Sequence, residues 1–169
     1  MKGMTDTQPT VTVLPERHYV AIPASVTMDT LGAVVPPLNG EVFRWLAERG
    51  IAPAGPPFWR YNVIDMAGLL EVEAGVTVAT AITGDERVQA GILPAGRYAT
   101  LRHVGAPDTL VAATVVLRDW AAAEGLKWDM SPSPEGEVWS CRLENYLTDP
   151  AIEPDLTKWV TELAYRLAD

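Results

Sequence analysis

Apolar and polar residues alternate in several stretches of the chain, the pattern of a β-strand with one buried face. Two such stretches, 58-FWRYNVI-64 and 69-LLEVEAGVTVA-79, lie in the first half, and a third, 138-VWSCRLENYL-147, lies in the second. Segment 159–169 is ambiguous, because its apolar residues suit either a strand or a helix. The pattern therefore predicts at least three strands.

Helical periodicity marks the middle of the second half. Apolar residues recur there at spacings of three and four, namely Leu110, Ala113, Leu117 and Trp120. This pattern predicts a helix from about Pro107 to Glu124, with Gly125 as its stop. In the first half Gly50 has the same role, and we expect Pro36-Pro37 to break that helix into two pieces.

The two halves of the chain are similar to each other. Residues 14–31 (LPERHYVAIPASVTMDTL) align without gaps with residues 93–110 (LPAGRYATLRHVGAPDTL), with six of 18 positions identical. Farther along, 45-WLAERGI-51 matches 120-WAAAEGL-126 in the same order. A duplication explains both matches, and it favours a strand at the C-terminus because the first half ends on one.

The duplication predicts an α+β fold made of two β-α-β-β units related by a pseudo-twofold axis. Its strands should form an antiparallel sheet with the helices on one face. We expect one domain at 11–169, with halves at about 11–80 and 87–169, after a flexible tail at 1–10.

Composition and charge exclude several classes of function and partner. The 169 residues include 13 basic and 22 acidic side chains, and a net charge of −9 repels phosphate backbones, so nucleic acid is not an expected partner. Cys141 is the only cysteine, which excludes a disulfide framework. No signal sequence is evident, and no apolar run approaches the roughly 18 residues of a membrane span, so we expect a cytoplasmic protein.

Common catalytic signatures are absent from the sequence. The two histidines, His18 and His103, do not stand at metal-ligand spacing from other ligands, and no metal or cofactor is expected. His103 follows a predicted strand in an apolar setting, where a structural role is favoured. There is no phosphate-binding loop, dinucleotide fingerprint or nucleophile elbow.

Aromatic residues are the candidates that remain. The chain has six tryptophans and five tyrosines against two phenylalanines. Trp59 and Trp139 each open the strand after a helix, so we match them in the duplication; they either line a shared groove or pack beneath the helices. Side chains two apart in a strand share a face, which groups Trp59 with Tyr61 and Glu144 with Tyr146. Glu144 is then either a solvated surface charge or part of an aromatic cavity.

Three motifs in order resemble the GyrI-like small-molecule-binding family, from about Val11 to Ala168. They are 93-LPAGRYATLRHVG-105, the glutamate–x–tyrosine of 144-ENYLTDP-150, and 161-TELAYRL-167. The resemblance implies a tandem pair of β-α-β-β units with a central cleft between them. It also implies that the C-terminal segment is a strand.

The resemblance further implies which residues bind a ligand. The family cleft takes hydrophobic, aromatic, often cationic compounds, with a glutamate at its floor that Glu144 matches, accompanied by Tyr146. Glu162 matches a second acidic position of some members. We expect Trp59, Tyr61, Trp139, Glu144 and Tyr146 to line one cavity. The residues before Val11 are too few for the helix-turn-helix of the family's activators, so a stand-alone receptor is expected.

Two other functions remain open. Some members of the family are implied to be hydrolases that open the cyclopropane of DNA-alkylating natural products. Glu144 would then activate water, and Tyr146 would hydrogen-bond the developing oxyanion. A third, less favoured hypothesis is an acidic surface that binds a protein such as gyrase.

Overall fold

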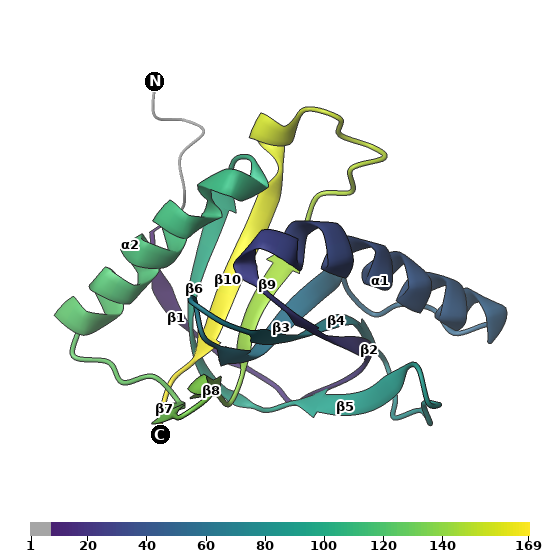
Figure 1. Cartoon of the computed structure of the whole chain (residues 1–169), viewed down its shortest axis with the longest axis horizontal. Helices are drawn as coiled ribbons and strands as arrows, with labels where there is room; N and C mark the ends of the chain where they lie inside the picture. The colour runs from purple at the N-terminus through teal and green to yellow at the C-terminus, as the bar shows by residue number, and fades with distance from the viewer. Residues whose placement is uncertain (1–7) are drawn as a thin grey trace.

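The computed structural model describes residues 8–169 as one ten-stranded sheet with two helices on one face (Figure 1). The helices are α1 (Met28–Glu48) and α2 (Leu110–Ala123), and η1 (Pro107–Thr109) and η2 (Leu156–Lys158) are short 3₁₀ turns. The strands are β1 (Thr10–Leu14), β2 (Arg17–Val26), β3 (Pro57–Ile64), β4 (Leu70–Val78), β5 (Gln89–Leu93), β6 (Gly96–Val104), β7 (Met130–Ser133), β8 (Gly136–Trp139), β9 (Arg142–Tyr146) and β10 (Val160–Arg166).

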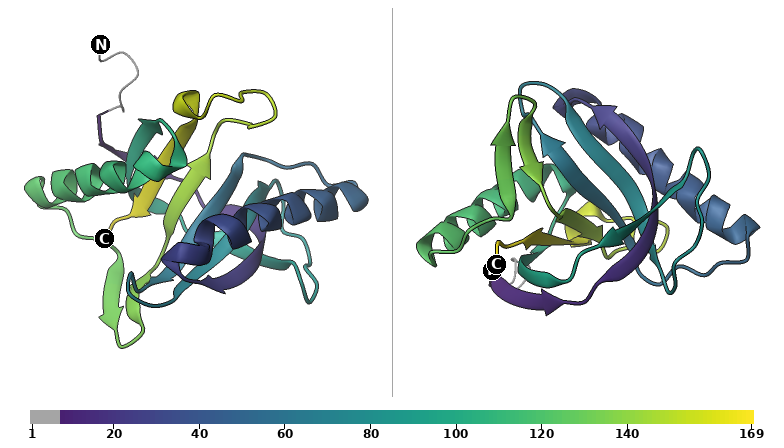
Figure 2. Two further views of the ribbon diagram at one scale, coloured as in Figure 1. Left: turned by 45° about the horizontal axis from the view of Figure 1, so that its top comes forward. Right: turned by 90° about the horizontal axis from the view of Figure 1, so that it is seen from below.

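The order of the strands confirms the duplication. It runs β1-β6-β10-β9-β3-β4-β2-β5, so each of these eight strands has a counterpart at the same distance from the β9–β3 seam. The sheet is antiparallel and strongly curled (Figure 2). The first strand of each unit, β1 or β5, pairs with the other unit, which interlocks the two halves.

The register identifies counterparts more closely than the sequence match does. Tyr19 of β2 and Tyr98 of β6 are counterparts in the sequence match. Their cross-strand pairs lead from β2 through β4 to β3 in the first half, and from β6 through β10 to β9 in the second. The matched positions at the seam are Trp59 with Glu144 and Tyr61 with Tyr146. The sequence-based match of Trp59 to Trp139 is therefore wrong. Trp139 lies in the hairpin β7–β8, which pairs with the end of β3 and has no counterpart in the first half.

Helix α1 differs from its prediction, because Pro36 and Pro37 lie inside one continuous helix. An internal proline removes a backbone hydrogen bond and costs about 3 kcal/mol. Packing on both sides of the prolines opposes that cost, since Val35 and Val42 are fully buried against the sheet. Both predicted helix stops are confirmed: Gly50 and Gly125 have φ of 66° and 71°, which glycine adopts without strain.

Most predicted strands are confirmed, with one difference. The predicted strand 138–147 is interrupted, because β8 ends at Trp139 and β9 begins at Arg142. The C-terminal segment forms β10, as the duplication favours. Of the predicted tail at 1–10, residues 1–7 lie outside the described residues, and Thr10 already belongs to β1.

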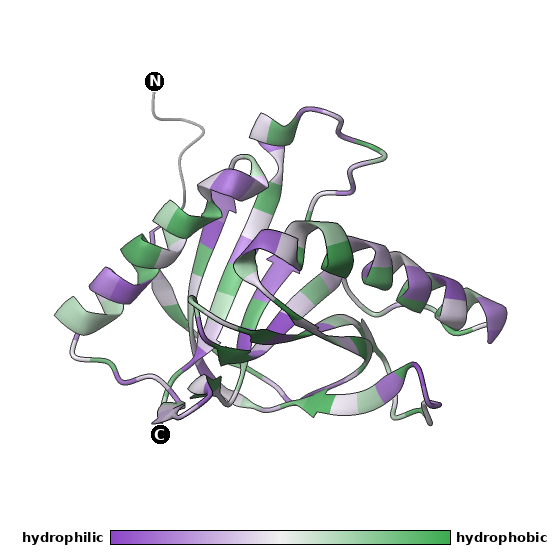
Figure 3. Ribbon diagram, in the orientation of Figure 1, coloured by the Kyte–Doolittle hydropathy of each residue, from purple (hydrophilic) through white to green (hydrophobic). Residues whose placement is uncertain are grey.

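Apolar residues form cores on both faces of the sheet. One face packs under α1 and α2, and the opposite face closes on itself through Tyr19, Phe58, Tyr98 and Leu143. Figure 3 shows apolar segments both on the strands and along α2. Among residues 8–169, neither helix combines the length and the apolar character needed to cross a membrane.

Candidate functional site

The candidate site lies at the seam between the two halves of the sheet. Trp59 of β3 and Glu144 of β9 are direct cross-strand partners, so their side chains leave the same face of the sheet. Tyr61 and Tyr146 are each two residues farther along and share that face. It is the face that carries the helices, because Trp59 and Tyr61 pack in the core cluster that includes Val35 of α1 and Leu117 of α2.

Both tyrosines hold the same oxygen atom of Glu144. The Tyr61 hydroxyl donates to Oε1 at 3.0 Å, and the Tyr146 hydroxyl donates to it at 2.6 Å. The rings of Trp59 and Tyr146 meet edge to face, with centroids 5.0 Å apart. Within the described part of the chain, Oε2 accepts no such hydrogen bond. One carboxylate oxygen is thus anchored, and the other is available to a ligand or to water.

Burial controls the protonation of this cluster. Desolvation raises the pKa of Glu144 above 4.5, while the hydroxyls of Tyr146 and Tyr61 and the charge of Arg142 pull the pKa down. Desolvation and the charge of Glu144 together hold the pKa of Tyr61 and of Tyr146 well above 10.0. The tyrosines therefore remain protonated donors at neutral pH, and Glu144 is an ionisable group at a partly desolvated position.

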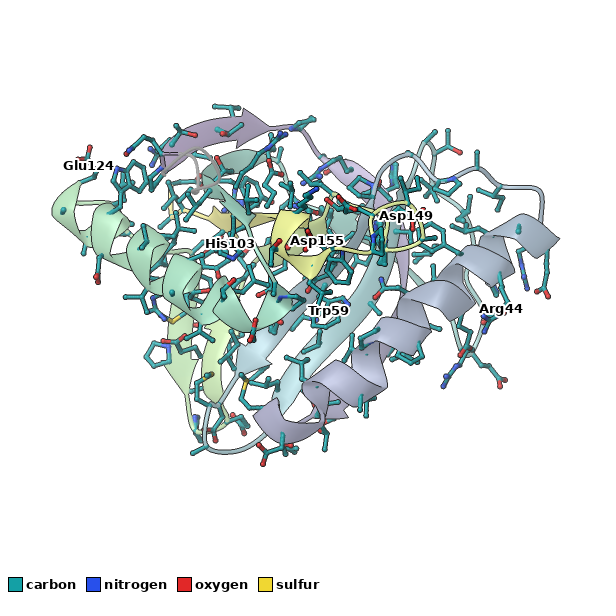
Figure 4. All side chains as sticks on the ribbon, turned by 90° about the horizontal axis from the view of Figure 1, so that it is seen from above. Arg44, Trp59, His103, Glu124, Asp149 and Asp155 are labelled. Atoms are coloured by element: carbon teal, nitrogen blue, oxygen red, sulfur yellow. The ribbon has the colours of Figure 1, made fainter. Side chains whose placement is uncertain are left out.

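Helix α1 fixes the orientation of Trp59. The indole Nε1 of Trp59 donates to Asn39 Oδ1 at 2.7 Å. The amide nitrogen of Asn39 donates in turn to the carbonyls of Phe58 and Gly75, each at 3.3 Å. Viewed from above in Figure 4, Trp59 is seen between α1 and α2. Because Asn39 bonds β3 and β4 as well, the ring is tied to the helix and to the sheet.

A second aromatic group adjoins Glu144. Arg142, two residues before Glu144 and on its face, lies over the Tyr165 ring at 4.3 Å and the Trp139 ring at 4.8 Å. Trp139 and Tyr165 contact each other and Trp128, with centroid separations of 5.6 and 5.7 Å. A half-buried carboxylate and a stacked guanidinium therefore share one face of the sheet with five aromatic rings, those of Trp59, Tyr61, Trp139, Tyr146 and Tyr165.

With this geometry in view, comparison with known proteins identifies the family. The sequence matches the GyrI-like small molecule binding domain over residues 7–167. The chain belongs to the GyrI-like family. A search of curated proteins found no match for this GyrI-like chain.

Solved structures agree with the GyrI-like fold. The EcmrR C-terminal domain has a TM-score of 0.74 at 19% identity, covering 96% of this chain and 98% of that one. SAV2435 bound to tetraphenylphosphonium has a TM-score of 0.62 at 10% identity, covering 96% and 94%. A hydrolase from Listeria innocua has a TM-score of 0.64 at 15% identity, covering 95% and 92%.

This chain corresponds to only part of a longer EcmrR chain. In an EcmrR–DNA complex the TM-score is 0.75 at 19% identity, and this chain spans 59% of the length of that EcmrR chain. At these identities the likeness establishes the shared fold. The GyrI-like fold of two duplicated halves is thus supported by sequence, by strand order and by solved structures.

The structure brings together four of the six residues predicted for the GyrI-like site, namely Trp59, Tyr61, Glu144 and Tyr146. Trp139 is 3% exposed and packs with Tyr165 and Arg142, beside these four residues. Glu162 does not join it. It pairs with Asn145 rather than Glu144, so it leaves the other face of β10, and it bonds Arg102 at 3.5 Å.

Three further residues of the site are not among those predicted from the sequence. Alternation could have found Arg142, two positions before Glu144, and Tyr165, which the same alternation places on the face opposite to Glu162. Asn39 carries no such signal, because it lies in a helix and meets Trp59 only through tertiary packing. His103 has the structural contact expected of it, with Nε2 2.6 Å from Thr109 Oγ1.

Other features of the GyrI-like domain do not extend this site. Among residues 8–169, no three histidine, cysteine or acidic side chains converge as metal ligands would. A shallow depression of about 230 Å³ lies over β2, β3 and β4, beside Asn62, Glu71 and Glu73. None of the predicted site residues lines it.

Proposed function

We propose that this GyrI-like domain is a receptor for hydrophobic aromatic small molecules, lipophilic organic cations among them, and that they bind against Trp59, Tyr61, Glu144 and Tyr146. One observation carries the proposal. A half-buried carboxylate is held by two tyrosine hydroxyls beside a tryptophan ring, and its second oxygen accepts no hydrogen bond from residues 8–169. A solvated surface glutamate would have no reason to be held in this way.

The physical chemistry of the cluster suits such ligands. A desolvated carboxylate attracts a cation by about 4 kcal/mol at 4 Å and an effective dielectric constant near 20, before desolvation of the cation is subtracted. Each aromatic face adds roughly 0.5–2 kcal/mol of cation–π attraction. Stacking and a single charge impose few directional demands, so specificity would be broad. The binding of tetraphenylphosphonium by SAV2435, which has the same fold, supports this class of ligand.

Titration with tetraphenylphosphonium tests the proposal. Isothermal calorimetry would compare the wild-type protein with Glu144→Gln, a substitution that keeps the shape of the side chain but removes its charge. We expect the substitution to weaken binding by about tenfold or more, which corresponds to at least 1.4 kcal/mol.

Glu162→Gln is the matched control, because Glu162 is an acidic residue of the adjacent strand but leaves the opposite face. It should bind tetraphenylphosphonium as the wild type does. Equal losses in the two variants would indicate a general effect of the −9 net charge and would contradict a local site. Unchanged binding by Glu144→Gln would remove Glu144 from the site.

Hydrolysis is the second candidate, and the raised pKa of Glu144 favours it. A carboxylate with a raised pKa is a better general base, and Oε2, which accepts no hydrogen bond from residues 8–169, can take a proton from water. In this reaction the water oxygen would bond to a cyclopropane carbon, and the electrons of the broken carbon–carbon bond would move to a conjugated acceptor. A hydrogen bond from Tyr146 to that acceptor competes with its bond to Glu144, which weighs toward the receptor.

Mass spectrometry separates the two functions. A cyclopropane-bearing alkylator is incubated with the wild-type protein and with Glu144→Gln, and the molecular mass of the recovered compound is measured. Addition of one water by the wild type alone would indicate a hydrolase. Recovery of intact compound from both proteins, together with binding that depends on Glu144, would indicate a receptor.

A further inference from the structure

Arg142 places a cation against the aromatic rings that adjoin the proposed site. Its guanidinium carbon lies 4.3 Å from the centre of the Tyr165 ring and 4.8 Å from that of Trp139. Both distances fall well inside the roughly 6 Å range of cation–π attraction. The protein therefore already places one delocalised cation against two aromatic rings, two residues from Glu144 and on the same face of β9.

The charge of Arg142 reaches the groups that would hold a ligand. Burial raises the pKa of Glu144, of Tyr61 and of Tyr165, and the positive charge of Arg142 acts against that rise at all three. Arg142 thus stabilises the ionised carboxylate through space. A cationic ligand beside Glu144 would be attracted by the carboxylate and repelled by the charge of Arg142.

Arg118 shows that this arrangement is particular to Arg142. It belongs to α2, lies 5.7 Å from the centre of the Trp139 ring, and forms an ion pair with Glu137 at 3.5 Å. Its charge has its own partner on the hairpin. Arg142 instead lies over the rings, hydrogen-bonds Tyr165 and acts on Glu144 through its charge. Its remaining guanidinium hydrogens are donors for an oxygen acceptor.

We propose that Arg142 is a specificity-determining residue of the site, which disfavours permanent organic cations and favours neutral aromatic compounds that carry an oxygen acceptor. This inference rests on the proposed receptor function and names the preferred ligand within it. Glu144 and Arg142 together make the site nearly neutral, so aromatic stacking and one hydrogen bond to the guanidinium dominate recognition. Cations still bind, but more weakly than the carboxylate alone would allow.

Two compounds of similar bulk test the inference: tetraphenylphosphonium, a cation, and triphenylphosphine oxide, which is neutral and has a strong oxygen acceptor. Each is titrated into wild type and Arg142→Met, in which methionine keeps an apolar contact with the rings. We expect the variant to bind the cation about tenfold more tightly, because repulsion is removed. It should bind the phosphine oxide several-fold more weakly, because the donor is lost.

Two further variants serve as controls. Arg142→Lys keeps the charge and should still disfavour the cation. Arg142→Gln, which also removes the charge, replaces Arg142→Met if that variant does not fold. Arg118→Met removes a guanidinium near the same tryptophan and should leave the preference between the two compounds unchanged. A purely structural role for Arg142 would change both affinities in the same direction, which overturns the inference.

A readout without ligand separates this inference from the proposed function. In Arg142→Met the pKa of Glu144, followed by carbon NMR, should rise above its wild-type value. If the cation binds both proteins equally and binding still depends on Glu144, the inference is wrong and the receptor function stands. If neither compound binds any variant, the receptor function fails and the inference fails with it, whatever the pKa of Glu144.

Discussion

Trp59 and Glu144 face each other across the seam between β3 and β9, and they are also each other's counterparts in the duplicated chain. The same position therefore holds an aromatic ring in one half and a carboxylate in the other. Their neighbours Tyr61 and Tyr146 are matched as well, and both donate to Glu144. A symmetric fold thus contains an asymmetric site, in which one carboxylate accepts hydrogen bonds from two tyrosines at equivalent positions.

Binding of tetraphenylphosphonium should be lost at acidic pH. The pKa of Glu144 is raised above 4.5, so the carboxylate takes up a proton as the pH falls through this raised value and the attraction disappears. Tyr146→Phe removes the larger of the two hydroxyl contributions that lower the pKa of Glu144. The pH at which this variant loses tetraphenylphosphonium binding should therefore be higher than for the wild type. Calorimetry at a series of pH values measures both midpoints.

Glu144→Gln provides the reference for this titration, because its residual binding should not change over the same pH range. Tyr61→Phe should shift the midpoint in the same direction as Tyr146→Phe, since its hydroxyl bonds the same oxygen. A midpoint that stays in place in both tyrosine variants would exclude the hydroxyls as determinants of the charge of Glu144.

Asn39→Ala should destabilise the protein and loosen the site together. The substitution leaves the indole nitrogen of Trp59 without its acceptor and the carbonyls of Phe58 and Gly75 without their side-chain donor. Loss of a buried hydrogen-bond partner costs about 1–3 kcal/mol. Urea unfolding should show that loss, and tetraphenylphosphonium should bind more weakly because the Trp59 ring is no longer held.

Asn62→Ala is the comparison for Asn39. Asn62 also belongs to this region of the sheet, but it donates to Glu73 away from the site and is only half-buried. We expect a smaller loss of stability and unchanged ligand binding. Wild-type affinity in Asn39→Ala would mean that packing alone orients Trp59.

Asp85, in the segment between β4 and β5, should make stability depend on pH. Its carboxylate accepts from the backbone of Val88 and Arg87 and from the Trp45 indole, which lowers its pKa from 3.8 to about 2. Because the folded pKa lies below the unfolded one, the stabilisation is present above 3.8 and is lost as the pH falls toward 2.

Urea unfolding of Asp85→Ala at neutral pH and near pH 2 measures this contribution. The variant should be less stable than the wild type at neutral pH, and the difference should shrink in acid. Asp65→Ala, which removes the acceptor of the Ala67 backbone N–H, controls for loss of a turn carboxylate. A difference between Asp85→Ala and wild type that is constant with pH would show that the ionised form has no special role.

Much of this protein was determined by local pattern. Alternation with a period of two predicted that Glu144 shares a face with Tyr146 and Trp59 with Tyr61, because side-chain direction in a strand depends only on position. The internal match of residues 14–31 to 93–110 predicted the duplicated α+β fold. Gly50 and Gly125 predicted the ends of the helices, since each needs only its own positive φ.

Tertiary structure decided the rest. The register of β3 against β9 pairs Trp59 with Glu144, and the register of β10 against β9 turns Glu162 to the other face. Burial against the sheet keeps α1 continuous through its prolines, and the contact of Asn39 with Trp59 joins a helix to a strand. Each of these joins residues distant in sequence, and the free energy of such contacts depends on packing and register, which local residue preferences do not contain.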